Sequence, residues 1–425
     1  MHILVIPSEF FEHKEIPLAG IFQKDSIKVL VKNNCQVGVL AIKPEYTTYD
    51  LIYSTVKTRI GTLNKLSLFK SWFQFVLSLL IPIKYRLRMY ASTDCFVVKY
   101  KGPYSLNTKN DKNKEKDWIK IGDKAYKKYV AKFGKPDVIH AHNIKFAGIL
   151  GNALSKKYET PIVLTEHSSS HYFNKLSQSQ INDLREEFQT IDIVSSVSPS
   201  LSILLKEKYS LDKEIDSLPN LIDLDFGKKL SIPKRESHEF RFIQVASLIP
   251  LKNQELLIRA FYKAFANEKN IKLTIVGSGS EYENLTQLVQ DLLLTNQVYL
   301  KGELGREQVA EEMANSNVLV HSSNYETFGV VLIEAMSLGK PVVSTSCGGP
   351  NFIVNKENGI LVPVNNEKEL ANAMTNIYNS YDKYDSKYIM QEVRAKFSEA
   401  SYWKKLEALY KRAISKNKKF LSNSI

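Results

Sequence analysis

Two glutamates spaced eight positions apart, Glu326 and Glu334, flank the start of an expected helix. The apolar run Val318–His321 predicts a strand and the stretch after it predicts a helix, so Glu326 lies in the connecting loop. The first N–H groups of a helix, here those of residues 328–330, are suited to a phosphate or to sugar hydroxyls. A carboxylate beside them can hold vicinal hydroxyls. The pattern also fits a simpler interpretation, in which both glutamates are ordinary charges of a helix start and a solvated helix face.

Lys252 and two histidines are further candidates for contact with a charged or hydroxylated ligand. Lys252 precedes Asn253 at an expected helix start, where a lysine is either a surface residue or a point charge for phosphate. His167 follows the strand-like run Ile162–Thr165. An imidazole titrates near neutral pH and can orient hydroxyls, although a lone histidine near a strand end is more often structural. His142 is a second candidate of the same kind.

The sequence contains no motif typical of a bound metal or dinucleotide cofactor. Asp223-Leu224-Asp225 is a D-x-D sequence, but its place in an expected junction between domains argues against metal ligation. His167 and His171 do not form H-E-x-x-H, which makes a zinc site improbable. After Gly277-Ser278-Gly279, Tyr282 stands where G-x-G-x-x-G requires glycine, and no phosphate-binding P-loop occurs. We therefore expect no metal and no cofactor.

Composition narrows the class of protein. The chain has 425 residues, of which 44% are hydrophobic and 24% charged, so it can bury sizeable cores and is neither disordered nor fibrous. Its net charge of +13 suits an anionic partner such as a nucleotide, a phospholipid surface or a nucleic acid. The 3 scattered cysteines favour a reducing cytoplasm, and neither a signal peptide nor a spanning segment is expected.

Short apolar strands alternate with helices along most of the chain, which predicts parallel sheets covered by helices. In the front half the expected strands are Ile3–Ile6, Val37–Ile42, Val138–His140, Ile162–Thr165 and Asp192–Val197. The pattern restarts with Arg241–Ala246, Ile271–Val276, Val298–Lys301, Val318–His321 and Pro341–Ser344. The polar stretch Asp223–Glu239 between the halves is a linker candidate. Ligands of such sheets bind beyond the carboxyl ends of the strands.

Three segments depart from this alternation. Leu66–Tyr90 combines aromatic and apolar residues with a basic end, so it either lies in the interface of an anionic membrane or forms a core helix. Thr108–Lys128 is rich in lysine and is expected to be a solvated loop leading into a helix. Ser398–Lys416 carries apolar residues at helical spacing and predicts a helix.

The sequence E-x7-E, with Phe-Gly after the first glutamate and Glu-Ala-Met at the second, resembles the retaining GT-B glycosyltransferases of glycosyltransferase family 4. The resemblance covers nearly the whole chain. Further segments that match the family's motifs are Pro17–Phe22, Asp137–His142, Pro161–His167, Pro219–Asp223, Ser337–Val343, Cys347–Gly349 and Asn358–Val362. Together these matches are specific, whereas any one of them alone would be weak.

The resemblance implies an α/β fold of the GT-B type, with two Rossmann-like doubly wound domains facing a central cleft. Residues 1–223 would form the acceptor-binding domain and residues 224–396 the domain that binds a nucleotide-sugar donor. Residues 397–425 would form a C-terminal helix that crosses back to the first domain.

The resemblance also implies roles for individual residues. Glu334 would hold the ribose hydroxyls of the donor, Lys252 its pyrophosphate, and Glu326 its sugar. His167 matches a histidine at the junction of sugar and acceptor, so the implied catalytic residues are His167 and Glu326. The implied donor-binding residues are Gly20, Lys252, Phe328, Gly329, Val330 and Glu334. Further residues expected to border the site are Ser247, Asn253, Gly277, Gly302 and His142.

Two positions depart from the family pattern. Ser247 stands where the family often has an arginine, so the charge of the pyrophosphate would rest more on Lys252 and on backbone amides. After Gly348-Gly349 the family usually has a glutamate one residue further on, and here Pro350-Asn351-Phe352 follows. The second difference affects a loop contact and leaves the implied reaction class unchanged.

The function implied by the resemblance is transfer of a sugar from a UDP- or GDP-sugar to an acceptor hydroxyl with retained configuration and without a metal. A glycan or lipid-linked acceptor would suit bacterial surface or exopolysaccharide assembly by a cytoplasmic protein, with anionic membrane contact through residues 66–90. One alternative is a glycoside hydrolase that uses Glu326 and Glu334 as its carboxyl pair. Another is a basic, non-enzymatic protein that binds membrane or nucleic acid. No basic stripe interleaved with aromatics supports binding to single-stranded nucleic acid.

Overall fold

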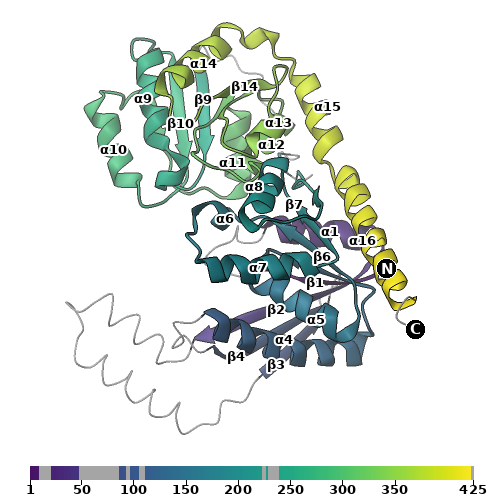
Figure 1. Cartoon of the computed structure of the whole chain (residues 1–425). Helices are drawn as coiled ribbons and strands as arrows, with labels where there is room; N and C mark the ends of the chain where they lie inside the picture. Colours follow the sequence, from purple (N-terminus) through teal and green to yellow (C-terminus); the bar gives the residue numbers. More distant parts are fainter. Residues whose placement is uncertain are drawn as a thin grey trace, which may run out of the picture. The chain divides into compact units, whose positions relative to one another are not determined.

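The computed structural model describes residues 1–8, 21–46, 86–91, 96–104, 111–222, 226–227 and 239–422 (Figure 1). The chain divides into two compact units. The first comprises Met1–Glu166, Leu176–Ser195 and Glu407–Ile425, and the second comprises His167–Lys175 and Ser196–Leu406. The sequence interpretation places its boundaries at residues 223 and 396, whereas this division groups residues 196–222 with the second unit.

The first sheet has eight strands in the order β3-β4-β2-β1-β5-β6-β7-β8. These strands are β1 (His2–Ile6), β2 (Gln36–Tyr46), β3 (Arg86–Ala91), β4 (Phe96–Tyr104), β5 (Val138–His142), β6 (Ile162–Glu166), β7 (Ile193–Ser196) and β8 (Ile215–Ser217). Strand β1 pairs in parallel with β2 and β5, and β3 runs antiparallel to β4 at the edge. The helical elements of the first unit are α1 (Ile21–Lys32), α4 (Asp111–Phe133), the π-helical turn η1 (Ile144–Gly148), α5 (Ile149–Tyr158) and α7 (Gln178–Thr190).

The second sheet has six strands in the order β11-β10-β9-β12-β13-β14, all paired in parallel. Its strands are β9 (Phe240–Val245), β10 (Ile271–Val276), β11 (Val298–Leu300), β12 (Val318–His321), β13 (Val342–Thr345) and β14 (Gly359–Val362). The α-helices that belong largely to this unit are α6 (Ser170–Phe173), α8 (Pro199–Tyr209), α9 (Gln254–Phe265), α10 (Tyr282–Asp291), α11 (Arg306–Ala314), α12 (Val330–Ser337), α13 (Pro350–Ile353), α14 (Glu367–Asn379) and α15 (Ser386–Phe397). Short 3-10 turns form η2 (Pro250–Lys252) and η3 (Tyr381–Lys383), and α16 (Glu399–Ser422) follows α15.

In both sheets the strand order reverses beside the first strand. Strand β1 lies between β2 and β5, and β9 lies between β10 and β12. Because crossovers between parallel strands are right-handed, the connections that leave the first strand in opposite directions along the sheet pass over opposite faces of it. The predicted α/β class with two doubly wound units is therefore confirmed. The carboxyl ends of the strands at each reversal are where such sheets bind ligands.

Helix α9 shows how the sequence fixes the second unit. The Asn253 side chain accepts a hydrogen bond from the Leu256 amide and so caps the helix start. Leu257, Phe261 and Phe265 recur at helical spacing, and all three are buried in the core between the sheet and α14.

One prediction about the first unit is wrong in part. The interpretation of Leu66–Tyr90 as one helix fails at its end, because residues 86–90 belong to β3. Backbone pairing with β4, in the register Arg86 to Lys101, fixes them as a strand. The segment 47–85, and with it the expected membrane contact, lies outside the described residues, as does most of Asp223–Glu239. The prediction of a solvated loop at Thr108–Lys128 is also wrong in part, because α4 begins at Asp111 and includes the rest of that segment.

The C-terminal helix α16 extends beyond the predicted range of 398–416. Its Tyr410 is fully buried, and the Tyr410 hydroxyl lies 2.8 Å from Nδ1 of His140. The other ring nitrogen of His140 lies 2.9 Å from the Thr165 hydroxyl, so strands β5 and β6 and helix α16 share one buried polar network.

We expect Phe261→Ala to lower the free energy of unfolding of the second unit by about 3–5 kcal/mol, because it removes a fully buried ring and leaves a cavity. Urea denaturation followed by circular dichroism measures the loss. Tyr262→Ala is the matched control, since the neighbouring Tyr262 side chain is 44% exposed. Equal losses for the two variants would contradict the assignment of this core.

Candidate functional site

The candidate site of the second unit lies at the reversal of its strand order. Strand β9 ends at Val245 and β12 ends at His321. The loops that follow these two neighbouring strands carry Lys252 and Glu326. Residues 74 positions apart in the chain are therefore brought together at one edge of the sheet.

Glu326 forms the central contact of this edge. Its Oε2 lies 2.6 Å from Nζ of Lys252 and 3.7 Å from Nε2 of His321. Both partners of the lysine–glutamate ion pair keep about a fifth of their side-chain surface exposed, at 20% and 19%. Hydroxyls of Ser323 and Ser344 lie 3.1 and 3.3 Å from the two ring nitrogens of the buried His321. The carboxylate thus stands between a cation and an anchored imidazole.

These neighbours decide the ionisation of Glu326. Burial alone would raise the pKa of its carboxyl group, but His321 and the charge of Lys252 together outweigh that effect and hold the pKa well below its usual value of 4.5. Glu326 is therefore an anion at neutral pH. An ionised carboxylate can accept hydrogen bonds from hydroxyl groups but has no proton to donate.

The backbone around Glu326 is fixed by the glycine pair that follows β13. The Glu326 amide donates to the Cys347 carbonyl at 2.9 Å. The Gly349 amide donates to the Glu326 carbonyl at 2.7 Å. A Cβ atom on Gly349 would come within 2.3 Å of Cα of Phe328, so only glycine allows the two loops to approach this closely.

Helix α12 begins directly after this loop. Gly329 precedes it with a φ of 99°, a left-handed conformation that favours glycine. The Thr327 amide donates to Oε1 of Glu326 at 3.1 Å. The next amides, those of Phe328, Gly329 and Val330, open the helix, and the first turn of a helix leaves such groups without partners inside it. An anion is favoured at this position.

Glu334 lies on α12, and its contact with Arg306 was missed by sequence reasoning. The Arg306 guanidinium lies 3.4 Å from Oε1 of Glu334, and the two side chains keep 26% and 15% of their surface exposed. Arg306 also lies over the ring of Phe226, 5.8 Å from its centroid. Nothing in the sequence relates Glu334 to an arginine 28 positions away at the start of another helix.

The other residues predicted to border the site lie on neighbouring loops of the same unit. Asn253 donates to the side chains of Asn324 and Asn365, at 3.0 and 2.9 Å. Ser247 is exposed after β9. The Gly277 amide donates to the Gly302 carbonyl at 2.8 Å, which joins the loops after β10 and β11.

Residues at the starts of α6 and α8 contact the loops that follow β12 and β13 through hydroxyl groups and aromatic rings. Ser198 donates to the Thr327 carbonyl at 2.6 Å, and Ser200 donates to the Gly348 carbonyl at 3.0 Å. The ring of Tyr172 stacks on that of Tyr325, with centroids 4.1 Å apart. Burial raises the pKa of Tyr325, whose hydroxyl therefore stays protonated. Sequence reasoning did not find these contacts, because serines near a helix start usually serve as caps.

The first unit carries His142 at the end of β5, beside its own reversal of strand order. Burial lowers the pKa of His142 to about 3, and the nearby Glu166 only partly opposes this effect. His142 is therefore neutral at pH 7. The Ile144 amide donates to the Glu166 carboxylate at 2.7 Å. His167 follows β6, is grouped with the second unit and is half-buried, while Gly20 lies outside the described residues.

Within the described ranges, no group of three or more His, Cys, Asp or Glu side chains could hold a metal ion. No helix in those ranges is both long and apolar enough to cross a bilayer.

Comparison with known proteins agrees with the geometry. Residues 105–226 match the family model "Glycosyltransferase Family 4", and residues 227–402 match "Glycosyl transferases group 1". The chain is 30% identical over 217 residues to N-acetyl-alpha-D-glucosaminyl L-malate synthase of Bacillus anthracis, an alignment that spans 49% of this chain and 56% of that relative. The chain thus matches only about half the length of this relative.

Two solved structures show the same fold. Sucrose-phosphate synthase of Thermosynechococcus elongatus superposes with a TM-score of 0.69 at 20% identity, covering 98% of this chain and 100% of that one. The Anabaena protein HepE in complex with UDP superposes with a TM-score of 0.65 at 18% identity, covering 96% and 99%. The fold is therefore of the GT-B type. Since the two family models adjoin and together span more than half of the chain, this protein belongs to the glycosyltransferases of family 4.

We expect Glu326→Gln to destabilise the second unit by about 1–3 kcal/mol near neutral pH, because Lys252 loses a partly buried charged partner. The folded-state pKa of Glu326 lies below 4.5, so its stabilising effect is complete above that value and is lost as the pH falls through the lower, folded-state pKa. The difference in unfolding free energy between wild type and variant should shrink on acidification.

Urea denaturation at steps between about pH 7 and pH 3.5 measures this difference. Glu369→Gln, at an exposed position of α14, is the control for the loss of a carboxylate elsewhere in the unit. A difference that grows as the pH falls would mean that Glu326 is held protonated, contrary to the contacts described.

Proposed function

We propose that this protein transfers a sugar from a nucleoside diphosphate sugar to an acceptor hydroxyl, with retention of the anomeric configuration and without a metal ion. The observation that carries the proposal is the Lys252–Glu326 ion pair beside the start of α12. A cation, helix amides and an ionised carboxylate stand together there, and a donor offers a pyrophosphate and a hydroxylated sugar to match them.

Donor binding would exchange the partners of Lys252. The lysine would turn from Glu326 to the donor pyrophosphate, and the amides of Phe328, Gly329 and Val330 would bind phosphate and sugar oxygens. Glu326, relieved of its cation, would accept hydrogen bonds from the sugar hydroxyls. Glu334, oriented by Arg306, would hold the ribose hydroxyls. The UDP bound to the structurally similar HepE supports a nucleotide ligand for this fold.

In the proposed transfer, the protein forms no covalent bond with the sugar. The bond from the anomeric carbon to the phosphate oxygen breaks, and the acceptor oxygen bonds to the same face of that carbon. The acceptor proton passes to the departing phosphate. Lys252 and the α12 amides stabilise the negative charge that develops on the phosphate. His167 would orient the acceptor, and Ser247, Asn253, Gly277, Gly302, Gly20 and His142 would border the substrates.

The ionisation of Glu326 argues against the hydrolase alternative. A glycosidase needs one carboxyl group with a raised pKa, so that it can protonate the leaving oxygen. The pKa of Glu326 is shifted in the opposite direction, and the Glu334 carboxylate lies against an arginine. Both features suit carboxylates that bind hydroxyls.

Three further points are predictions from the family resemblance. The donor carries UDP or GDP, the acceptor is a glycan or is lipid-linked, and the protein acts in the cytoplasm in the assembly of bacterial surface glycans or exopolysaccharides. Sugar specificity depends on pocket contacts worth about 1–3 kcal/mol each.

We expect one nucleoside diphosphate, added with EDTA at about a hundred times its dissociation constant, to raise the melting temperature of the wild type by about 5–10 °C. Glu334→Ala should abolish this shift, because it removes the carboxylate that would hold the ribose. Differential scanning fluorimetry with UDP, GDP and ADP makes the measurement. Glu369→Ala on α14 should keep the full shift. Equal shifts for wild type and Glu334→Ala, or no shift for a folded wild type, would refute the assigned donor site.

A further inference from the structure

Helix α6 exposes two large aromatic side chains that pack against each other. Tyr172 and Phe173 keep 53% and 45% of their surface exposed. Their rings meet edge to face, with centroids 4.9 Å apart and an angle of 81° between the planes. Single exposed apolar residues are common, but two packed rings form a continuous apolar surface, which is typical of a site that binds a ligand.

A third ring, that of Tyr325, supports the first two. Tyr172 stacks on Tyr325 with centroids 4.1 Å apart and planes only 9° from parallel. Phe173 stands perpendicular to Tyr325, at 5.8 Å between centroids. Because Tyr325 is 9% exposed, it forms the base on which the two exposed rings lie. We refer to Tyr172, Phe173 and Tyr325 as the aromatic platform.

The aromatic platform borders the carboxylate of the candidate site. Glu326 follows Tyr325 directly in the chain, and its backbone pairs with that of Gly348 in an isolated β-bridge. Burial is the main cause that raises the pKa of Tyr325, and the negative charge of Glu326 is the next. Since such an effect weakens with distance, the Tyr325 phenol and the Glu326 carboxylate are close to each other.

Contacts from α8 hold α6 in place. The buried His171 has its Nδ1 2.7 Å from the Tyr209 hydroxyl. Nζ of Lys208 donates to the carbonyls of His171 and Asn174, the latter at 3.1 Å. A helix of four residues has little stability of its own, so these contacts fix it, and all of the residues involved belong to the second unit. Because the exposed rings are already positioned, binding a ligand requires little further ordering.

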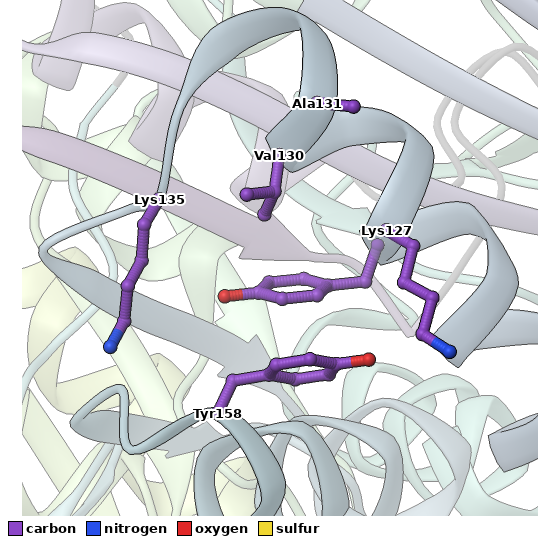
Figure 2. A pocket seen from close by; sticks show the side chains of 6 residues that line it. Lys127, Val130, Ala131, Lys135 and Tyr158 are labelled. Carbon is purple, nitrogen blue, oxygen red and sulfur yellow. The ribbon is translucent and has the colours of Figure 1, made fainter.

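A pair of tyrosine rings in the first unit differs from the platform. Tyr126 and Tyr158 lie 4.6 Å apart between centroids, in the wall of a recess of about 380 Å³. Figure 2 shows the Tyr158 ring with Lys127 and Lys135 extending on either side of it. Tyr126 is 1% exposed, and the Tyr158 hydroxyl donates to Asp123 at 2.6 Å. Packing between α4 and α5 explains this pair, whereas packing does not explain the exposed rings of α6.

We propose that the aromatic platform binds the acceptor by stacking on the C–H face of a pyranose ring, so that the acceptor is a cyclic sugar and not an acyclic alcohol. The C–H groups of a pyranose form an apolar face, and its hydroxyls extend from the edge. An aromatic ring covers the first and leaves the second open to reaction. The inference rests on the proposed function, in which Glu326 binds the donor sugar, because a sugar on the platform would then lie next to that donor.

Loss of the two exposed rings should weaken the binding of a pyranoside about tenfold, because the apolar face of the sugar then stays in water. Nucleotide binding should not change, since Lys252, Glu334 and the amides at the start of α12 are untouched. The variant Tyr172→Ala/Phe173→Ala, which we call the platform variant, makes this change. Phe173→Ala alone, which leaves the stack of Tyr172 on Tyr325 intact, should cause a smaller loss.

Saturation-transfer difference NMR on the full chain tests the proposal. The probes are the methyl pyranosides of glucose, galactose, mannose and N-acetylglucosamine at millimolar concentration, with glycerol and L-malate as acyclic controls. Each is titrated with and without the nucleoside diphosphate that stabilises the protein. We expect the wild type to saturate the ring C–H protons of at least one pyranoside and not the acyclic controls, and the platform variant to bind that pyranoside about tenfold more weakly.

Two further variants show whether the effect belongs to the rings of α6. Tyr172→Phe/Phe173→Tyr keeps both rings, exchanges only the hydroxyl and should retain the binding. Tyr262→Ala/Tyr282→Ala removes two rings of the same unit that are 44% and 42% exposed, and it should bind the pyranoside like wild type. The melting temperature of each variant without ligand checks that it is folded.

Three results would overturn the proposal: no saturation of any pyranoside by the wild type, equal binding by the wild type and the platform variant, or equal losses for that variant and Tyr262→Ala/Tyr282→Ala. Loss of the nucleotide-induced rise in melting temperature in the platform variant would also overturn it, because the rings would then support Glu326 and not the acceptor. A wild type that no nucleotide stabilises would refute the donor site itself, so failure of the platform and failure of the proposed transfer are distinguishable.

Discussion

The carboxylate of Glu326 is removed from most of its water, and its charge is tolerated only because Lys252 and His321 compensate it. The surrounding architecture supplies this compensation. Parallel strands place the loops after β9 and β12 side by side, and the glycine pair at 348–349 lets the next loop approach the backbone of Glu326. An anionic ligand can compete with the carboxylate for the cation, and hydroxyl groups of the ligand can then donate hydrogen bonds to the carboxylate in place of the lysine.

Much of the fold was predictable from local patterns. Short apolar strands between amphipathic helices specify a parallel sheet, and Asn253 marks a helix start by its residue type. The edge strand β3 was not predictable, because its residues end an apolar and basic stretch whose pattern fits the end of a helix as well as a strand. What decides its state is pairing with β4, and that partner is not visible in the segment itself.

The sequence indicates the charged residues of the candidate site but not the residues that contact and orient them. Lys252, Glu326 and Glu334 stand out because they match the motifs of the family, since each also has an ordinary structural explanation as a charge at or near a helix start. Arg306 and Ser198 act through contacts with residues far away in the sequence, and such contacts depend on tertiary packing. His321 is close to Glu326 in the sequence, but the direction of its ring at the end of β12 also depends on packing. A single sequence offers no local signal for them.

The first unit is assembled from three separate stretches of the chain, the last of which begins at Glu407. During synthesis at about 5–20 residues per second, this last stretch leaves the ribosome some 10 to 40 s after Ser195. Until then the buried imidazole of His140 lacks the Tyr410 hydroxyl, while nearly all of the second unit has already emerged. The order of structural completion is therefore inverted with respect to the order of translation, and the amino-terminal unit must wait, exposed to chaperones and proteases, for the end of its own chain.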